Sequence, residues 1–189
     1  TVVAQFLTIP DSLPDFLQGL GPIQILAWTT TPWTLPSNTA LTVGPKIDYV
    51  LVKTFNQYTF QPIQVILAKN LVETQFDKKF EKAESEDALE LYQSTDKKIP
   101  YYIVKEFKGQ DLIGIRYEQL LPYALPYDHP ENAFRVIGGD FVTTEDGTGI
   151  VHTAPTFGAD DAKVAKEAKP EVPPMLVLDE NNNPVPLVD

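Results

Sequence analysis

The sequence contains no cysteine, only two histidines and no long apolar run. The absence of cysteine excludes a disulfide framework and thiolate zinc sites, and it agrees with a reducing cytoplasm. His129 and His152 cannot build a zinc site by themselves. A membrane-spanning helix needs roughly 18 or more consecutive apolar residues, and this chain has no such run. We therefore expect a cytoplasmic chain that holds no metal and contacts no membrane.

Positive charge is scarce in this chain. It has 15 Lys and Arg against 26 Asp and Glu, which gives a net charge of -11. A broad nucleic-acid surface draws its affinity from clustered cations that release counterions, so this charge balance argues against one. The densest basic cluster, Lys78, Lys79 and Lys82, is interleaved with acidic residues and is best explained as a solvated mixed-charge face. The charge leaves room only for a small basic contact.

Several catalytic motifs are also missing. The chain has no Gly-x-Ser-x-Gly nucleophile elbow, no phosphate-binding P-loop, no His-Glu-x-x-His and no Gly-x-Gly-x-x-Gly after a strand. Gly147-Thr-Gly149 matches only the first three positions of a dinucleotide fingerprint and lies in a predicted turn. We therefore expect no cofactor.

The length and composition fit one domain. A chain of 189 residues with 43% apolar content is large enough to bury a core of its own. Residues 1–6 already have strand character, residues 184–189 end in extended chain, and there is neither an initiator Met nor a signal peptide. We expect residues 1–189 to be a single domain excised from a longer protein.

Short β-rich runs separated by turn residues dominate the chain. The predicted strands are 1–7, 22–28, 47–54, 62–67, 100–106, 134–137, 141–145 and 148–154. Asp146-Gly147 between the last two runs predicts a hairpin. Helical spacing predicts helices at 85–93, 159–168 and 117–121. The fold class is thus mainly β with a few peripheral helices, most simply a closed or half-closed barrel, with 77–98 as a surface excursion.

Three consecutive hydroxyl side chains, Thr29, Thr30 and Thr31, are the first candidate site. They suit neither a helix interior nor an apolar strand, and Pro32 and Pro36 are expected to prevent regular hydrogen-bonded structure after them. No base is adjacent, so a nucleophilic role is disfavoured. Hydroxyls of this kind suit the positioning of a substrate, its ester carbonyl or an attacking water.

Two nearby side chains extend this segment. The amide of Asn38 can pair with a carbonyl or a base edge. Trp33 offers a stacking surface, although a core position is the more common explanation for such an aromatic residue. Both interpretations of Trp33 stay open at the level of sequence.

A second candidate site surrounds His152. This histidine ends a β run, and Pro155 and Gly158 then turn the chain into the predicted helix at 159–168. We therefore expect His152 to lie near the helix N-terminus. Asp160 and Asp161 fall in the first helical turn, where one carboxylate stabilises the helix and the other is free to hold a cation such as an ammonium group.

At this point the sequence resembles a known family. Thr29-Thr-Thr-Pro-Trp-Thr-Leu-Pro-Ser-Asn38 is similar to the threonine-rich peptide in the editing domain of isoleucyl-tRNA synthetases. Gly147-Thr-Gly-Ile-Val-His-Thr-Ala-Pro155, with Gly158 and Asp160-Asp161, looks like the second signature of that domain. Valyl and leucyl relatives typically carry Arg directly after the threonines, whereas this chain continues with Thr31-Pro32-Trp33, which points to the isoleucyl branch.

The resemblance implies a β-barrel-like editing domain, connective peptide 1, inserted into the Rossmann core of a class I synthetase. Its activity would be post-transfer editing, the hydrolysis of the ester bond in misacylated valyl-tRNA(Ile). Such editing is needed because the synthetic site of this enzyme, a worked example in the general theory of specificity, prefers isoleucine to valine only about 150-fold. The implied partners are the 3′ terminal adenosine of tRNA(Ile) carrying valine and the rest of the parent synthetase in cis, and the isolated domain would be a monomer.

The resemblance also implies roles for single residues. Asp161 would bind the α-ammonium of the misattached amino acid, His152 would help to place the terminal adenosine or the scissile ester, and Thr30 would make a direct contact. The other implied substrate-binding residues are Thr29, Thr31, Trp33, Thr34, Asn38 and Asp160. An ester needs only an oriented water and charge stabilisation, so neither a metal nor a catalytic triad is required.

Two departures from the family limit these implications. Many bacterial members carry a second histidine at the position of Phe157, so a mechanism that relies on that histidine does not transfer. The chain also lacks both adenylate-forming signatures, so ATP and Mg²⁺ would belong to a synthetic site outside it. Three alternatives stay open: a catalytically inactive module that binds the tRNA 3′ end, an editing domain of the valyl or leucyl type, and an unrelated β domain.

Overall fold

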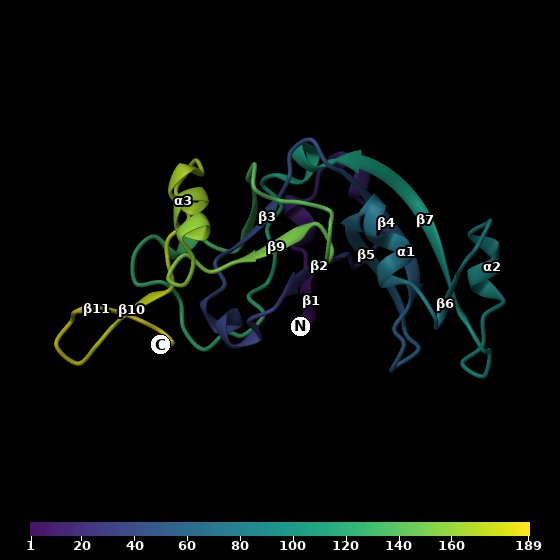
Figure 1. Cartoon of the computed structure of the whole chain (residues 1–189), viewed down its shortest axis with the longest axis horizontal. Coiled ribbons are helices and arrows are strands. Elements are labelled where there is room, and N and C mark those ends of the chain that lie inside the picture. Colours follow the sequence, from purple (N-terminus) through teal and green to yellow (C-terminus); the bar gives the residue numbers. More distant parts are fainter.

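The computed structural model describes all of residues 1–189 as an elongated molecule built mainly of β-strands (Figure 1). Nine strands form the main sheet: β1 (Val2–Leu7), β2 (Gln24–Thr29), β3 (Ala40–Val43), β4 (Asp48–Phe55), β5 (Pro62–Ala68), β6 (Phe80–Lys82), β7 (Ile99–Lys108), β8 (Arg135–Gly138) and β9 (Ile150–Thr153). A separate antiparallel hairpin consists of β10 (Leu176–Leu178) and β11 (Pro184–Pro186).

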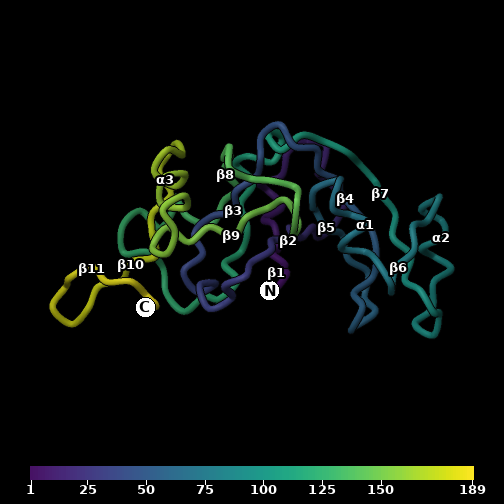
Figure 2. Tube along the Cα trace, viewed as in Figure 1, coloured from purple at the N-terminus to yellow at the C-terminus, as the bar shows by residue number.

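Helices are short and lie around the sheet. The α-helices are α1 (Val72–Gln75), α2 (Asp87–Glu90) and α3 (Ala159–Glu167). The 3-10 helices are η1 (Pro10–Ser12), η2 (Asp15–Leu17), η3 (Pro32–Ser37), η4 (Lys69–Leu71), η5 (Gly109–Leu112) and η6 (Pro130–Asn132). In Figure 2 the α2 segment lies at one end of the molecule, while α3 and the β10–β11 hairpin lie toward the other end. No helix of the structure combines the length and the apolar character that a bilayer crossing requires.

The strand order is β6-β7-β4-β5-β2-β9-β3-β8, with β1 paired to β2. β2 runs antiparallel to β1 and parallel to both β5 and β9, which share its other edge. β9 therefore lies between β2 and β3, pairing parallel to the first and antiparallel to the second. This position brings together segments that are more than a hundred residues apart in the sequence.

A short extended segment, residues 115–117, closes part of the sheet into a ring. On one side it pairs with β8: Val136 N–H donates to the carbonyl of Ile115 at 2.8 Å. On the other side it follows the end of β1, where Ile9 N–H donates to the carbonyl of Arg116 at 2.8 Å. The ring β1-β2-β9-β3-β8 is thereby completed through residues 115–117, which confirms the predicted barrel.

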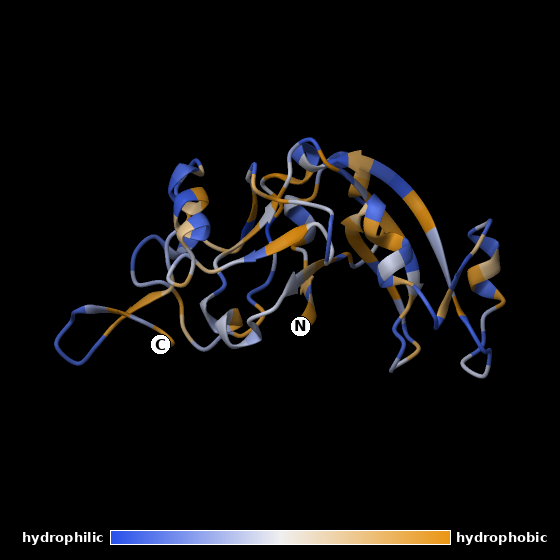
Figure 3. Cartoon of the chain, viewed as in Figure 1, coloured by the Kyte–Doolittle hydropathy of each residue, from blue (hydrophilic) through white to orange (hydrophobic).

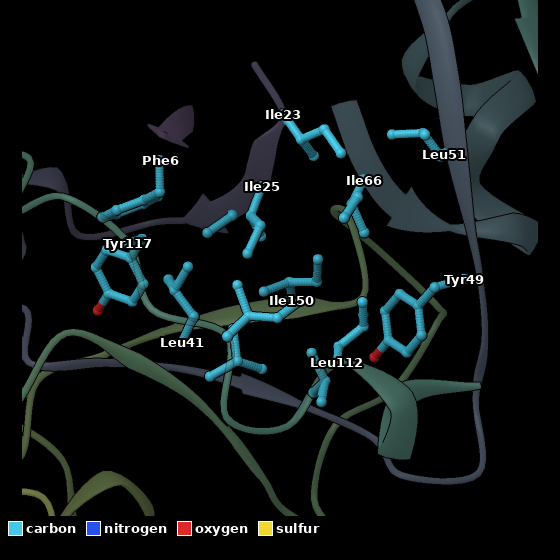
Figure 4. Close-up of a cluster of buried hydrophobic side chains, with 14 of the residues drawn as sticks. Phe6, Ile23, Ile25, Leu41, Tyr49, Leu51, Ile66, Leu112, Tyr117 and Ile150 are labelled. Carbon is cyan, nitrogen blue, oxygen red and sulfur yellow. The ribbon is translucent and has the colours of Figure 1, made fainter. Parts of the chain in front are cut away.

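The main core fills this ring and continues under β4 and β5. Figure 4 shows Phe6, Ile25, Leu41 and Ile150 converging from four different strands, with Tyr117 beside Phe6. The rings of Phe6 and Tyr117 meet edge to face with centroids 5.1 Å apart. Burying apolar area of this kind contributes about 25 cal/mol per Å², so this cluster is the main source of stability.

Two smaller clusters cover the outer faces of the sheet. Alternate residues of β4 and β5 point away from the main core, and Val50 and Leu67 are fully buried under α1. On the other side α3 packs Val164 and Ala165 against Ile137 of β8. Figure 3 shows the same distribution: apolar residues follow the strands, and the turn of the β10–β11 hairpin is hydrophilic.

Most of the expected strands are confirmed, but the hairpin at Asp146-Gly147 is wrong. Residues 141–145 form turns and coil, and β9 pairs with β2 and β3 instead. Gly147 and Gly149 have φ of 76° and 75°, so they bend the chain into the sheet. A Cβ on Gly149 would lie 2.4 Å from the Cβ of Ala68, which shows that glycine also permits close contact with β5.

Among the helices, the one expected at 159–168 is confirmed as α3. The helix expected at 85–93 is reduced to the single turn of α2, and the helix at 117–121 is wrong, because Tyr117 belongs to the extended segment that closes the barrel. Four strands were not predicted: β3, whose four residues are all buried, β10, β11, and β6, which lies within the expected surface excursion at 77–98. A four-residue run is too short to show a clear period.

Candidate functional site

The two predicted motifs lie side by side at one end of the barrel. β2 ends at Thr29, and its Trp28 pairs with Val151 of β9. β9 places His152 opposite Leu41 and Thr153 opposite Ala40 of β3. The threonine segment, the start of β3 and the end of β9 therefore meet, as two halves of one site require.

The threonine segment has regular structure after all. Residues 32–37 form the 3-10 helix η3, in which Thr34 N–H donates to the carbonyl of Thr31 at 3.0 Å. The expectation that prolines exclude hydrogen-bonded structure is wrong here, because Pro32 occupies the first helical position, where an N–H has no partner anyway. Upstream, Thr31 N–H donates to Oγ1 of Thr29 at 3.0 Å and fixes the bend between β2 and η3.

Exposure differs sharply along this segment. Thr29 is buried, Thr30 is exposed and Thr31 is half-buried, so Thr30 is the most accessible residue of the three. Trp33 is 66% exposed, which rules out a core position for this side chain and leaves its ring free to stack. Thr34 is buried, at 4% exposure.

His152 is buried and hydrogen-bonded at both ring nitrogens. Its Nε2 lies 2.9 Å from Oγ1 of Thr34, and its Nδ1 lies 2.9 Å from Nδ2 of Asn38. Burial lowers the pKa of the imidazole to about 4, so His152 is neutral at physiological pH. The structure thus joins three predicted site residues, His152, Thr34 and Asn38, in one buried network.

This network includes a residue that neither sequence motif predicts. Tyr117 donates its hydroxyl hydrogen to Oδ1 of Asn38 at 2.5 Å. Its side chain is buried, and burial raises the pKa of the phenol well above its usual value. Tyr117 belongs to neither motif, and only the closure of the barrel brings it to Asn38, so no local signal in the sequence indicates its place.

Asp161 lies at the N-terminus of α3, close to the end of β9. Its Oδ2 accepts a hydrogen bond from Ala154 N–H at 2.9 Å, so the helix start lies against the segment that directly follows β9. The carboxylate is half-buried, and burial raises its pKa above the ordinary value of 3.8. No hydrogen bond or ion pair within the chain engages its Oδ1.

The neighbours of Asp161 are more accessible. Asp160 is exposed and adds to the negative potential that raises the pKa of Asp161. Phe157 is 41% exposed and lies in the turn that precedes α3. A cavity of about 610 Å³ between β4, β5 and α2 is lined by none of these residues. No group of three or more His, Asp or Glu side chains is arranged to hold a metal ion.

Sequence comparison finds isoleucine--tRNA ligases among the relatives of this chain. No model of a known protein family matches the chain. It is 54% identical over all 189 residues to the isoleucine--tRNA ligase of Bacteroides fragilis, and 60% identical over 164 residues to that of Cytophaga hutchinsonii. These matches cover all and 87% of this chain, but the chain spans only 16% and 14% of the two relatives.

Comparison with solved structures shows the fold. The crystal structure of GlLeuRS-CP1 superposes with a TM-score of 0.57 at 16% identity, over 95% of this chain and 72% of that one. The editing domain of P. knowlesi cytosolic leucyl-tRNA synthetase superposes with a TM-score of 0.60 at 15% identity, over 89% of this chain and 62% of that one. The predicted fold class and the resemblance carried by the two motifs are both confirmed.

Proposed function

We propose that this chain, highly similar over its whole length to a segment of isoleucine--tRNA ligases and folded like synthetase editing domains, hydrolyses the ester bond of valyl-tRNA(Ile) after transfer. The observation that carries the proposal is the meeting of the threonine segment, His152 and Asp161 at one end of the barrel. The substrate is the esterified 3′ end of the tRNA, and the remainder of a parent synthetase acts in cis.

Asp161 supplies the charge for recognition of the amino acid. An esterified amino acid carries a free α-ammonium group, and Oδ1 of Asp161 has no partner within the chain. Partial burial strengthens this interaction, because water screens it less than at an exposed surface. The hydrogen bond from Ala154 to Oδ2 holds the carboxylate toward the end of β9. We therefore assign the ammonium to Asp161, with Asp160 adding negative potential at the rim.

The exposed part of the threonine segment orients the ester and the water. Thr30 is exposed at the end of β2, and the half-buried hydroxyl of Thr31 lies beside it. Trp33 offers its open ring to the terminal adenine, because base stacking on an aromatic side chain contributes about 1–3 kcal/mol. Hydrolysis proceeds by orientation of water and stabilisation of developing charge, without a metal or a cofactor.

Four buried residues hold the threonine segment and the end of β9 in place: His152, Thr34, Thr29 and Asn38. His152 is neutral, and the Asn38 amide and the Thr34 hydroxyl occupy its two nitrogens, so it is placed to hold the site in shape. This assignment requires no proton transfer at the position of Phe157, so it does not depend on the second histidine that many bacterial members carry there. The chain thus edits with one carboxylate at the surface and a hydrogen-bonded frame beneath it.

The domain contacts only the end of the tRNA. A net charge of -11 provides little counterion release, so most of the affinity for tRNA comes from the parent enzyme. As an isolated monomer the domain is expected to bind tRNA weakly. A dissociation constant below about 1 μM at physiological salt, measured by filter binding, would contradict this assignment.

The decisive experiment is deacylation of valyl-tRNA(Ile) and isoleucyl-tRNA(Ile). The chain replaces the matching segment of the Bacteroides fragilis enzyme and is assayed beside Asp161→Asn, with Glu167→Gln at the other end of α3 as a control. A charge-assisted hydrogen bond contributes about 1.5–3 kcal/mol, so Asp161→Asn should lower kcat/KM for the valyl ester about 10- to 150-fold.

The control and the substrate preference decide between the proposals. Glu167→Gln should keep the full rate, and the valyl ester should be cleaved far faster than the isoleucyl ester. If neither ester is cleaved above the spontaneous rate, the chain is an inactive module that binds the tRNA 3′ end. If another aminoacyl ester is preferred, the substrate assignment is wrong while the hydrolytic function stands.

A further inference from the structure

In the buried network of Tyr117, Asn38, His152 and Thr34, the donor and the acceptor of each hydrogen bond are fixed. Nδ2 of Asn38 lies 2.9 Å from the carbonyl oxygen of Ala40, which only accepts hydrogen bonds. The amide of Asn38 must therefore turn its nitrogen toward Ala40 and its oxygen toward Tyr117. In the opposite orientation two acceptor oxygens would face each other in a buried place. The backbone of β3 thus selects one orientation of Asn38.

The orientation of Asn38 in turn selects one tautomer of His152. The second hydrogen of Nδ2 points to Nδ1 of His152, 2.9 Å away, so Nδ1 must be the acceptor. A neutral imidazole then carries its hydrogen on Nε2 and donates it to Oγ1 of Thr34 at 2.9 Å. A second proton on Nδ1 would face an N–H donor, which opposes the charged form in addition to burial.

The same direction continues into the threonine segment. Oγ1 of Thr34 accepts from His152 and donates its own hydrogen to the carbonyl of Thr31 at 2.9 Å. Oγ1 of Thr31 lies 3.3 Å from Oγ1 of Thr34 and 3.4 Å from Oγ1 of Thr29. The hydrogen bonds therefore run from Tyr117 through three side chains to the backbone that holds Thr30 at the surface.

Tyr117 is the first donor of this series. Its ring packs against Phe6 and Phe134, with centroids 5.1 Å and 6.3 Å away, while its hydroxyl reaches Oδ1 of Asn38. No other group donates to this buried oxygen. Without the hydroxyl, Oδ1 would be left without a partner, and the amide would lose the contact that holds it in place.

We propose that Tyr117 is a positioning residue of the editing site, which acts through Asn38, His152 and Thr34 to hold the threonine segment in its reactive conformation. This inference rests on the proposed ester hydrolysis. Tyr117 touches neither the ester nor the water. Its hydroxyl satisfies Oδ1 of Asn38 and so holds the amide in the orientation that Ala40 selects, on which the tautomer of His152 and the direction of the Thr34 hydroxyl depend.

The test compares Tyr117→Phe with Tyr49→Phe in the hybrid synthetase. Tyr49 is a matched control, because it is equally buried, and its hydroxyl donates to the carbonyl of Gly149 at 2.6 Å and accepts from Gly44 N–H at 2.9 Å. Tyr49→Phe loses two hydrogen bonds and should destabilise the fold at least as much as Tyr117→Phe. Only Tyr117→Phe should lower kcat for the valyl ester, about tenfold, with KM unchanged.

A spectroscopic arm tests the network without any substrate. The chain has only two histidines, so ¹⁵N-histidine labelling resolves the imidazole of His152 from that of exposed His129. The unchanged chain and Tyr49→Phe should show a proton on Nε2 of His152 that exchanges slowly with water. In Tyr117→Phe this proton should exchange faster, and a share of the Nδ1–H tautomer should appear.

Each outcome decides one assignment. Equal loss of kcat in both tyrosine variants would reduce Tyr117 to a contributor to stability and overturn the inference. A proton on Nδ1 of His152 in the unchanged chain would overturn the direction of the network. If the unchanged chain cleaves neither ester, the proposed function is wrong, and the imidazole spectra alone then decide whether Tyr117 controls His152.

Discussion

Acidification should destabilise this protein through His152. The imidazole is 6% exposed, and burial lowers its pKa from 6.5 to about 4. Between these two values the unfolded chain binds a proton that the folded chain does not. Stability therefore falls as the pH drops through this window, and it is fully retained above about pH 6.5.

The magnitude follows from the two pKa values. Linkage between protonation and folding predicts a loss of about 1 kcal/mol at pH 5.5 and about 2–3 kcal/mol at pH 4.5. This is a large part of the roughly 5–15 kcal/mol by which a domain is stable. His129 acts in the opposite direction, because Glu131 and Asp128 raise its pKa and so favour the folded state at acid pH.

Urea unfolding followed by tryptophan fluorescence measures this effect at a series of pH values between 7 and 4.5. The change in unfolding free energy with pH is compared between the unchanged chain and His152→Gln. Both proteins carry the same carboxylates, so the effect of their titration cancels in this comparison. His152→Gln should lose most of the acid sensitivity. His129→Asn, which suits the left-handed backbone at that position, should steepen it slightly. Parallel curves for the unchanged chain and His152→Gln would refute the reasoning.

Three further expectations concern single positions. Gly149→Ala should destabilise the fold by more than about 2 kcal/mol in urea, because strain adds to the contact with Ala68, whereas Gly19→Ala, with similar φ and open space, should show strain alone. Trp33→Ala should change the unfolding free energy by less than about 0.5 kcal/mol yet slow valyl-ester cleavage. The proposed binding of the ammonium to the Asp161 carboxylate predicts that cleavage declines as the pH falls through the raised pKa of Asp161, which a pH profile of kcat/KM checks.

Local chemistry made part of the site predictable. Pro155, Gly158 and the two aspartates predicted where α3 begins, and the structure places Asp161 there. Helix caps and breaks depend on neighbouring residues, so a sequence reveals them directly. The two motifs also predicted one site from separate segments, and the pairing of β9 with β3 brings them together.

Tertiary contacts decided the features that sequence could not predict. The hairpin signal at Asp146-Gly147 failed because this turn packs against β2 and does not fold back on itself. The packing is so close that a Cβ on Gly147 would lie 2.8 Å from the Trp28 ring. Tyr117 entered the site only through the closure of the barrel. Trp33 is exposed at the start of η3, although its apolar ring suggested a core position.

The inner position of β9 has a consequence for synthesis of the chain. β9 is the last strand of the main sheet to leave the ribosome, yet it separates β2 from β3. About a hundred residues are made between the end of β3 at Val43 and the start of β9 at Ile150. During that time β3 and the second half of β2 each keep an unpaired edge, which invites pairing with other chains. Nascent chains that stop before residue 150 are therefore candidates for aggregation and for capture by chaperones.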